Sequence, residues 1–342
     1  MQNPLWYFQN TPHTLHSERG QPNIPEIETM RAMLTPAHYW PIDNVWGLHD
    51  FTEGGAQNGA AFLNYLKYSY GTPKDLEDFV RRAQLVTYEN HRAMFEAVYT
   101  SNGNGLLMWM SQSAWPSMVW QTYDYWHDIN GGYAGAKAGN QPRNVIFNRA
   151  TKNFWLVNAT PQPLLGATAT LEVFGLDGRK LYADSSRFSL EADGLRAWRD
   201  FPAIAHASPI RFLRTSIRDA NGQKLSENFT WYNVNGDRNY RELANLPAVA
   251  VAVKTTRIDG TAGNARGEVT LVNKGNAPAL MIRVKVLDAN ANRVLPVFYS
   301  DNYFTLMPGE SRRVTWETKA PLPPDRYTIH IGGWNVVQCT TR

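Results

Sequence analysis

One carboxylate, Glu18, has neighbours that suit catalysis better than they suit a solvated surface. It lies in the stretch HTLHSERGQPNIPEIETM, residues 13–30, and is followed by Arg19, Gly20 and a turn between prolines. A carboxylate at the end of a buried strand can face a substrate and act on it as a nucleophile. The alternative is an ion pair with Arg19, although adjacent side chains on a strand point to opposite faces. From the residues alone, both roles of Glu18 remain open.

Aromatic residues are the second feature that points to chemistry. The chain has 12 tryptophans, and those that precede residue 156 are Trp6, Trp40, Trp46, Trp109, Trp115, Trp120, Trp126 and Trp155. Large aromatic side chains most often fill protein cores, and this role must account for several of them. The other role is sugar binding, because the flat apolar face of a pyranose stacks on an aromatic ring. Composition alone leaves both roles open.

Helical signals dominate the chain before residue 140. The stretch from residue 71 to residue 101 predicts a long helix with Thr72 as the cap, Pro73 at the first helical position and Asp75 in a capping box. Its apolar residues fall largely on one stripe at a spacing of about 3.6 residues, so we expect one face to be buried. Two shorter helices are predicted over residues 24–34 and 56–70.

Two short apolar runs bracket these helices. Residues 14–17 and 106–110 are too short for helices and fit buried parallel strands. The order of strand, long helical excursion and strand is typical of an α/β unit. Glu18 directly follows the first of these strands, and Trp109 lies in the second.

Strand-like segments separated by turn residues fill the chain after residue 140. Between Leu280 and Val286, aliphatic residues alternate with positions that include Arg283 and Lys285, which predicts a sheet with one face towards solvent. Three segments repeat a pattern of two strands joined by an Asp/Asn/Gly turn. This region therefore predicts two β-sandwiches of about 100 residues each, with a boundary near residues 241–248.

Composition and motifs limit the classes of function. A formal net charge of +4 without a Lys/Arg run longer than a pair argues against nucleic acid as a partner. No stretch approaches the ~20 apolar residues that a membrane span needs. The single cysteine, Cys339, cannot form an intrachain disulfide, and the 8 histidines are scattered without the spacing of a zinc site. No glycine-rich phosphate loop follows a strand, so we expect neither a metal nor a cofactor.

Six segments, in order along nearly the whole chain, resemble glycoside hydrolase family 2, and within it the branch of exo-β-glucosaminidases, β-mannosidases and endo-β-mannosidases. They read HSERGQPNIPEIETM, WPIDNVWGLHDF, DFVRRAQLVTYENHRAMFEA, GLLMWMSQSAWPSMVWQTYD, GGYAGAKAGNQP and PVFYSDNYFTLMPGES. The resemblance implies the C-terminal part of a TIM (β/α)8 barrel, with strands seven and eight, over residues 1–138. It implies two immunoglobulin-like β-sandwiches over residues 139–244 and 245–342. The expected fold class is therefore α/β followed by all-β.

The resemblance also implies a reaction and roles for Glu18, Trp109 and Trp115, while His16 and His49 are candidates because of their positions in the chain. Retaining glycosidases use two carboxyl groups about 5 to 5.5 Å apart, one as nucleophile and one as acid and base. Glu18 matches the nucleophile position, where it would form the covalent glycosyl-enzyme. Trp115 matches the aromatic wall that holds the sugar, and Trp109 matches either that wall or the barrel core. His16 is a candidate for orienting Glu18 and His49 for lining the cleft mouth, with core or capping roles equally open for His49.

The expected substrate is a glycan with terminal β-mannosyl or β-glucosaminyl linkages. The family's general acid lies on the fourth barrel strand, and we expect no residue of this chain to correspond to it. A barrel with open strand edges is unstable, so we expect a fragment that needs the N-terminal part of the same enzyme or a complementary chain. One alternative is a non-catalytic carbohydrate- or protein-binding sandwich module, and another is a degraded gene product with no role.

The compartment is not given by the first residues, which read MQNPLWYF and lack the basic region and cleavage site of a secretory signal. The family resemblance favours a periplasmic or secreted enzyme. Sugar specificity, exo or endo action and oligomeric state are set by features that the sequence does not reveal.

Overall fold

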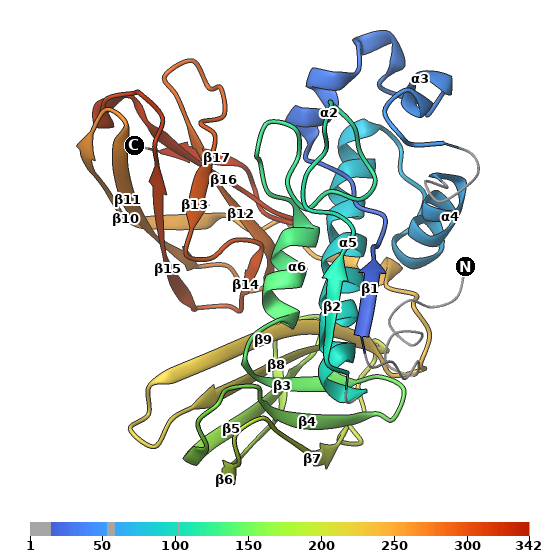
Figure 1. Ribbon diagram of the computed structural model, residues 1–342, viewed down its shortest axis with the longest axis vertical. Helices are drawn as coiled ribbons and strands as arrows, with labels where there is room; N and C mark the ends of the chain where they lie inside the picture. The colour runs from blue at the N-terminus through green and yellow to red at the C-terminus, as the bar shows by residue number, and fades with distance from the viewer. Residues whose placement is uncertain (1–14, 53–58, 102, 342) are drawn as a thin grey trace.

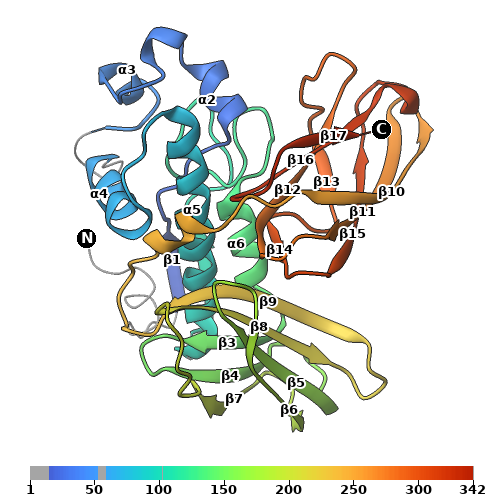
Figure 2. The same ribbon diagram turned by 180° about the vertical axis from the view of Figure 1, so that it is seen from behind.

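The computed structural model describes residues 15–52, 59–101 and 103–341, and shows a helical part flanked by two β-sandwiches (Figures 1 and 2). The helical part contains two short strands, β1 (Leu15–Arg19) and β2 (Gly105–Met108). Its helices are α2 (Ile27–Met33), η1 (Pro36–His38), α3 (Asn44–Gly47), α4 (Gly59–Tyr70), α5 (Leu76–Thr100) and α6 (Gly131–Gly139). No helix in the described ranges is long and apolar enough to cross a membrane.

The strands β1 and β2 run parallel, as predicted, and the chain between them passes through α5. The expectation that they are buried is wrong for this structure, since Leu15 is 59% and Leu107 62% exposed. His16 pairs with Leu106 and Arg19 pairs with Met108, so β1 takes three steps where β2 takes two. The additional residue is a bulge between His16 and Arg19, and it interrupts the alternation of side chains in the interval that contains Glu18. The simple alternation that would put His16 and Glu18 on one side therefore does not apply to this strand.

The helix α5 begins later than predicted and is buried on more than one face. Asp75 is its N-cap, because its carboxylate accepts a hydrogen bond from the Asp78 amide at 2.8 Å, and Thr72 lies before the helix. The prediction that Thr72 is the cap is therefore wrong. Four consecutive residues from Glu89 to Arg92 are buried, and four consecutive helical residues point to all sides. The expectation of a single buried stripe is also wrong.

A glycine stripe lets α6 lie directly on the backbone of α5. Gly131, Gly135 and Gly139 repeat every four residues, so they share one face of α6. A Cβ atom on any of them would lie between 2.1 and 2.5 Å from a carbonyl oxygen of α5, which is far inside van der Waals contact. These carbonyls repeat at the same interval and belong to Gln84, Tyr88 and Arg92. The glycines of the sequence GGYAGAKAG thus allow the backbones of α5 and α6 to be in direct contact.

The first sandwich follows α6 and consists of two antiparallel sheets, of three and four strands. The three-stranded sheet is β3 (Arg143–Asn148), β4 (Asn153–Asn158) and β7 (Gly194–Asp200). The four-stranded sheet is, in spatial order, β6 (Lys180–Leu190), β5 (Leu164–Phe174), β8 (Ile210–Arg218) and β9 (Lys224–Asn233).

Buried charges join α5 to this sandwich. Arg92, which is 1% exposed, bonds Glu89 at 3.0 Å and Glu96 at 2.6 Å on its own helix. The sandwich adds Arg149, which bonds Glu89 at 2.5 Å, and Thr230, whose hydroxyl lies 2.7 Å from Arg92. Buried charges are tolerated only when they are paired and hydrogen-bonded. The helix and the sandwich therefore supply partners that neither has alone.

The second sandwich is linked to the first through η2 (Arg241–Asn245) and has two four-stranded sheets. One sheet is β10 (Val251–Thr261), β11 (Asn264–Asn273), β15 (Ser311–Thr318) and β13 (Val297–Tyr299). The other is β14 (Phe304–Leu306), β12 (Ala279–Leu287), β16 (Thr328–Gly332) and β17 (Cys339–Thr341), with η3 (Pro324–Arg326) before β16.

The expectation that β12 has a face towards solvent is wrong. Met281 and Arg283 are 4% and 7% exposed, because this face packs against the helical part. The guanidinium of Arg283 lies 2.9 Å from Glu26 and 2.7 Å from Asp128, both of which belong to the helical part. A basic residue in an alternating strand pattern here marks a contact between domains.

The buried pairs on α5 predict a large loss of stability when Arg92 is replaced. Arg92→Ala should lower the free energy of unfolding by about 3 to 5 kcal/mol, because Glu96 loses its cation and Glu89 keeps one in place of two. The measurement is urea denaturation followed by tryptophan fluorescence. Arg313→Ala is the matched control, since Arg313 pairs with Glu268 but is 65% exposed. That control should change stability by less than about 1 kcal/mol, and equal effects of the two variants would contradict this view of α5.

Candidate functional site

Glu18 lies at the C-terminal end of β1, beside the C-terminal end of β2, and is exposed. The two strand ends are joined because the Trp109 amide donates a hydrogen bond to the Arg19 carbonyl at 2.8 Å. Gly20 makes this approach possible, since a Cβ atom there would lie 2.1 Å from the carbonyl oxygen of Trp109. The structure therefore brings Glu18 and Trp109 to the same end of the strand pair, the end where both strands terminate.

Trp109 and Trp115 differ from the other tryptophans of the helical part because they are exposed. They are 48% and 50% exposed, whereas Trp46 is fully buried and packs edge-on against Phe51 and Phe79. The half-buried tryptophans before residue 156 are Trp40, Trp120, Trp126 and Trp155. Trp6 lies outside the described residues. Core packing thus explains the buried ring of Trp46, while the rings of Trp109 and Trp115 are about half exposed, and the expectation that they bind a sugar stays a prediction.

His49 supports the segment that carries Trp115. Its ring Nδ1 lies 2.7 Å from the Pro116 carbonyl oxygen, so Nδ1 bears a hydrogen and donates a hydrogen bond to that carbonyl. The backbone carbonyl of His49 also accepts a hydrogen bond from the Met118 amide at 3.0 Å. His49 therefore holds the two residues, Pro116 and Met118, that come shortly after Trp115.

His16 has a different neighbour from the one expected. Its Nε2 lies 3.1 Å from the Arg19 guanidinium, so Nε2 is the acceptor and lacks a proton. This contact directs the ring of His16 towards Arg19 across the bulge of β1. The expectation that His16 orients Glu18 stays a prediction.

Asn23 is a positioning residue that the sequence did not reveal. It is 1% exposed, and its side-chain amide donates to the Gln121 carbonyl at 2.8 Å and to Asn130 Oδ1 at 2.9 Å. Its backbone exchanges two hydrogen bonds of 2.8 Å with Val119. The loop after β1 is thus tied to the loop after β2, which carries Trp115. A single asparagine near prolines looks like an ordinary turn residue, so no sequence signal marks this role.

Two aspartates connect the loop after β2 to the second sandwich. Asp124 accepts hydrogen bonds from the Trp126 and Asp128 amides, each at 2.9 Å, and so holds the loop in shape. Asp128 lies 2.7 Å from both Arg283 and Arg293 of the second sandwich. Burial, and then the neighbouring charge of Asp128, raise the pKa of Asp124 above its ordinary value. The sandwich arginines thus neutralise a pair of carboxylates that would otherwise repel each other.

Glu18 is an exposed carboxylate at the strand end that lies next to the exposed Trp109. Residues 15–52, 59–101 and 103–341 contain no group of three or more His, Cys, Asp or Glu side chains that could hold a metal ion. An exposed carboxylate beside exposed indole rings can form a bond to a carbon that a stacked sugar presents to it. A second carboxyl group about 5 to 5.5 Å away completes such chemistry in a retaining glycosidase.

Comparison with known proteins gives one family and several relatives. Residues 228–336 match the family described as the exo-β-D-glucosaminidase Ig-fold domain. The chain is 30% identical to an exo-β-D-glucosaminidase of Amycolatopsis orientalis, covering 92% of this chain and 33% of the relative. It is 25% identical to a mannosylglycoprotein endo-β-mannosidase of Lilium longiflorum, covering 98% of this chain and 43% of the relative.

A solved structure with similar fold is the exo-chitosanase CsxA of Amycolatopsis orientalis. It superposes with a TM-score of 0.86 at 29% identity, over 99% of this chain and 44% of that one. A β-D-mannosidase of Dictyoglomus thermophilum shares the fold, with a TM-score of 0.76 at 14% identity. The chain therefore spans between a third and a half of the length of the relatives that it matches.

The contact at Gly20 can be tested by hydrogen exchange. Gly20→Ala should push the ends of β1 and β2 apart, because the new methyl would overlap the Trp109 carbonyl oxygen. We expect faster deuterium uptake in peptides that cover residues 105–110, with protection of α5 retained. Gly47→Ala is the matched control, since a Cβ atom at Gly47 meets nothing within 4 Å. Unchanged exchange at residues 105–110 in Gly20→Ala would contradict the proposed contact.

Proposed function

The chain is related to the C-terminal part of the exo-β-glucosaminidase and mannosidase branch of glycoside hydrolase family 2, and we propose that it carries the nucleophile of a retaining β-glycosidase. The proposed substrates are glycans with terminal β-glucosaminyl or β-mannosyl linkages. The observation that carries the proposal is the exposed Glu18 at the C-terminal end of β1, joined by a hydrogen bond to the strand end that bears Trp109.

In the proposed reaction, Glu18 attacks the anomeric carbon and forms a covalent glycosyl-enzyme while the leaving oxygen takes a proton from a second carboxyl group. Water then attacks the same carbon and gives a proton to that second group, which restores both carboxyls. Trp109 and Trp115 stack on the sugar and hold its anomeric carbon near Glu18. His49 keeps the Trp115 segment in place.

We assign β1 and β2 to the seventh and eighth strands of a TIM barrel whose other strands come from the N-terminal part of the enzyme. The exposed apolar side chains support this assignment, because Leu15 on β1 is 59% exposed and Leu107 on β2 is 62% exposed. Such residues are normally covered within a barrel, where strands are hydrogen-bonded on both edges. The second carboxyl group is then a residue of the same N-terminal part, as the family resemblance implies.

The direct test of Glu18 is covalent labelling of the complete enzyme, in which this chain is joined to the N-terminal part. A 2-fluoro-glycoside with a good leaving group should add one sugar mass to the peptide that contains Glu18, because the fluorine slows both steps and the good leaving group speeds only the first. Glu18→Gln should abolish the label, and Glu191→Gln, at an exposed glutamate of the first sandwich, should retain it.

Two outcomes would contradict the proposal. A label on a different residue would show that Glu18 is not the nucleophile. Sugar binding without any label or turnover, unchanged in Glu18→Gln, would favour the alternative of a non-catalytic carbohydrate-binding module.

The proposed role of Trp115 predicts a change in binding. Trp115→Ala should raise the KM of the complete enzyme for an aryl β-glycoside about tenfold, because loss of one stacked ring costs roughly 1 to 1.5 kcal/mol. Tyr125→Ala is the matched control, since Tyr125 lies in the same loop and is 42% exposed. An equal rise of KM in both variants would show that loss of any large side chain from this loop weakens binding. That result would contradict the proposal that Trp115 stacks on the sugar.

A further inference from the structure

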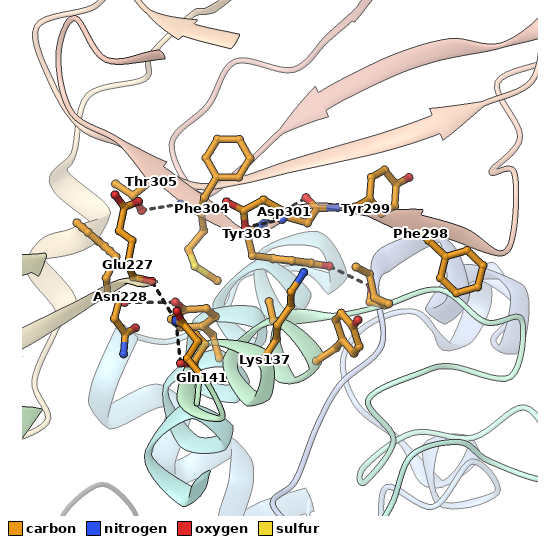
Figure 3. Close-up of a pocket in the computed structure, with 18 of the residues that line it drawn as sticks. Lys137, Gln141, Glu227, Asn228, Phe298, Tyr299, Asp301, Tyr303, Phe304 and Thr305 are labelled. Atoms are coloured by element: carbon orange, nitrogen blue, oxygen red, sulfur yellow. Dashed lines mark hydrogen bonds between the residues drawn. The ribbon is translucent and has the colours of Figure 1, made fainter. Parts of the chain in front are cut away.

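A cavity of about 710 Å3 lies between α6, β9 and the second sandwich, and its lining residues point towards one another from all three (Figure 3). Its lining includes Ser111 and Gln112, which are two and three residues after Trp109 in the chain, and Glu227 on β9. Its volume falls in the range of about 300 to 1,000 Å3 that is typical of ligand sites. The residues assigned to the reaction in the preceding subsection are not part of this lining.

Aromatic rings form part of the walls of this cavity. Tyr123 of the loop after β2 and Tyr133 of α6 lie with their ring centroids 5.1 Å apart, and both are half-buried. Phe298, on β13 of the second sandwich, is 60% exposed although it lines the cavity. An exposed phenylalanine on a strand that is otherwise packed offers a flat apolar surface to a ligand. Sugar rings present a matching apolar face.

The charges of the cavity favour an uncharged ligand over a cationic one. Arg312 pairs with both lining carboxylates, Glu227 and Asp301, so neither carboxylate is left to attract an ammonium group. Lys137 of α6 donates to the Ser300 carbonyl at 2.9 Å and forms no ion pair with any residue in the described ranges. Its positive charge therefore repels ammonium groups, and its remaining N–H groups can donate to hydroxyl or acetamido oxygens.

We propose that this cavity binds an uncharged stretch of the glycan substrate, built of hexosyl or N-acetylhexosaminyl units, and disfavours consecutive glucosaminyl units that carry ammonium groups. The inference rests on the proposed function for the nature of the substrate, and it deepens that function. Phe298 supplies the stacking surface and Lys137 supplies the hydrogen-bond donor. The second sandwich thus takes part in choosing which glycan chains the enzyme holds.

The test is isothermal titration calorimetry of the complete enzyme, in which this chain carries Glu18→Gln and is joined to the N-terminal part, with three tetrasaccharides as probes. These are N-acetylated chitotetraose, mannotetraose and fully deacetylated chitotetraose, at about pH 5, where amines are protonated. At least one uncharged probe should bind at least about tenfold more tightly than the deacetylated one. Phe298→Ala and Lys137→Ala should each weaken that binding about fivefold to tenfold, while Leu165→Ala and Lys319→Ala, at exposed positions elsewhere, should not.

Three results would overturn the inference: no binding of either uncharged probe, equal binding of the deacetylated probe, or no effect of Phe298→Ala and Lys137→Ala. Trp115→Ala is titrated alongside, because the proposed aromatic wall also binds sugars. Binding that is lost in Trp115→Ala and kept in Phe298→Ala would assign it to that wall and overturn the inference. Labelling of Glu18 is scored separately, so failure of the cavity site and failure of the glycosidase proposal are distinguishable.

Discussion

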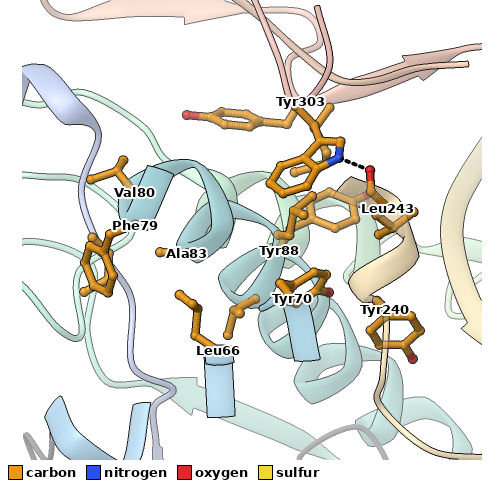
Figure 4. Close-up of a cluster of buried hydrophobic side chains, with 14 of the residues drawn as sticks. Leu66, Tyr70, Phe79, Val80, Ala83, Tyr88, Tyr240, Leu243 and Tyr303 are labelled. Atoms are coloured by element: carbon orange, nitrogen blue, oxygen red, sulfur yellow. Dashed lines mark hydrogen bonds between the residues drawn. The ribbon is translucent and has the colours of Figure 1, made fainter. Parts of the chain in front are cut away.

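The structure depends on the burial of α5, a helix with covered residues on all sides. Along one side its carbonyl groups touch the glycines of α6, which leaves no room for side chains. Along another side the Arg92 guanidinium bonds two glutamates and the first sandwich. A third, apolar face of α5, which includes Phe79 and Ala83, packs in one hydrophobic cluster with α4 and η2 (Figure 4). At this cluster the Trp334 indole of the second sandwich donates a hydrogen bond to the Leu243 carbonyl of η2 at 2.8 Å. Arg81 of α5 also donates to the Trp334 carbonyl at 3.0 Å, so both sandwiches contact this one helix.

This docking matters for the candidate site because the loop after β2 has little structure of its own. Asn23 holds it from the side of β1, and His49 holds its tip near Trp115. Asp128 is held by Arg283 and Arg293 from the second sandwich. The exposed rings of Trp109 and Trp115 therefore keep their positions through contacts that come from three separate parts of the chain. A sandwich that contributes no residue to the proposed reaction still shapes the wall on which the sugar would stack.

Sequence reasoning found the elements whose signals are local. Apolar spacing located α2, α4 and α5, and short apolar runs located β1 and β2 as a parallel pair. It failed where the answer depends on distant partners. The alternating pattern around Arg283 is the same whether its polar face meets water or a buried carboxylate. The carboxylate that Arg283 contacts is Asp128, which lies 155 residues earlier in the chain, so the local sequence does not indicate it. The role of Asn23 was not predicted for the same reason. The bulge between His16 and Arg19 is a property of strand pairing, so the pattern of side chains does not predict it. The roles of Glu18, Trp109, Trp115, His16 and His49, and the domain boundaries at residues 138 and 244, remain predictions.

The central claim is that Glu18 is the group that bonds to the sugar, and chemical rescue tests it most directly. In the complete enzyme, Glu18→Ala opens space for an added azide ion at the position of the missing carboxylate. With an activated aryl β-glycoside, our account predicts that azide restores turnover and that the product is the α-glycosyl azide, since one displacement replaces two. Formation of the β-glycosyl azide, which would assign Glu18 the acid–base role, or absence of any rescue, would contradict it.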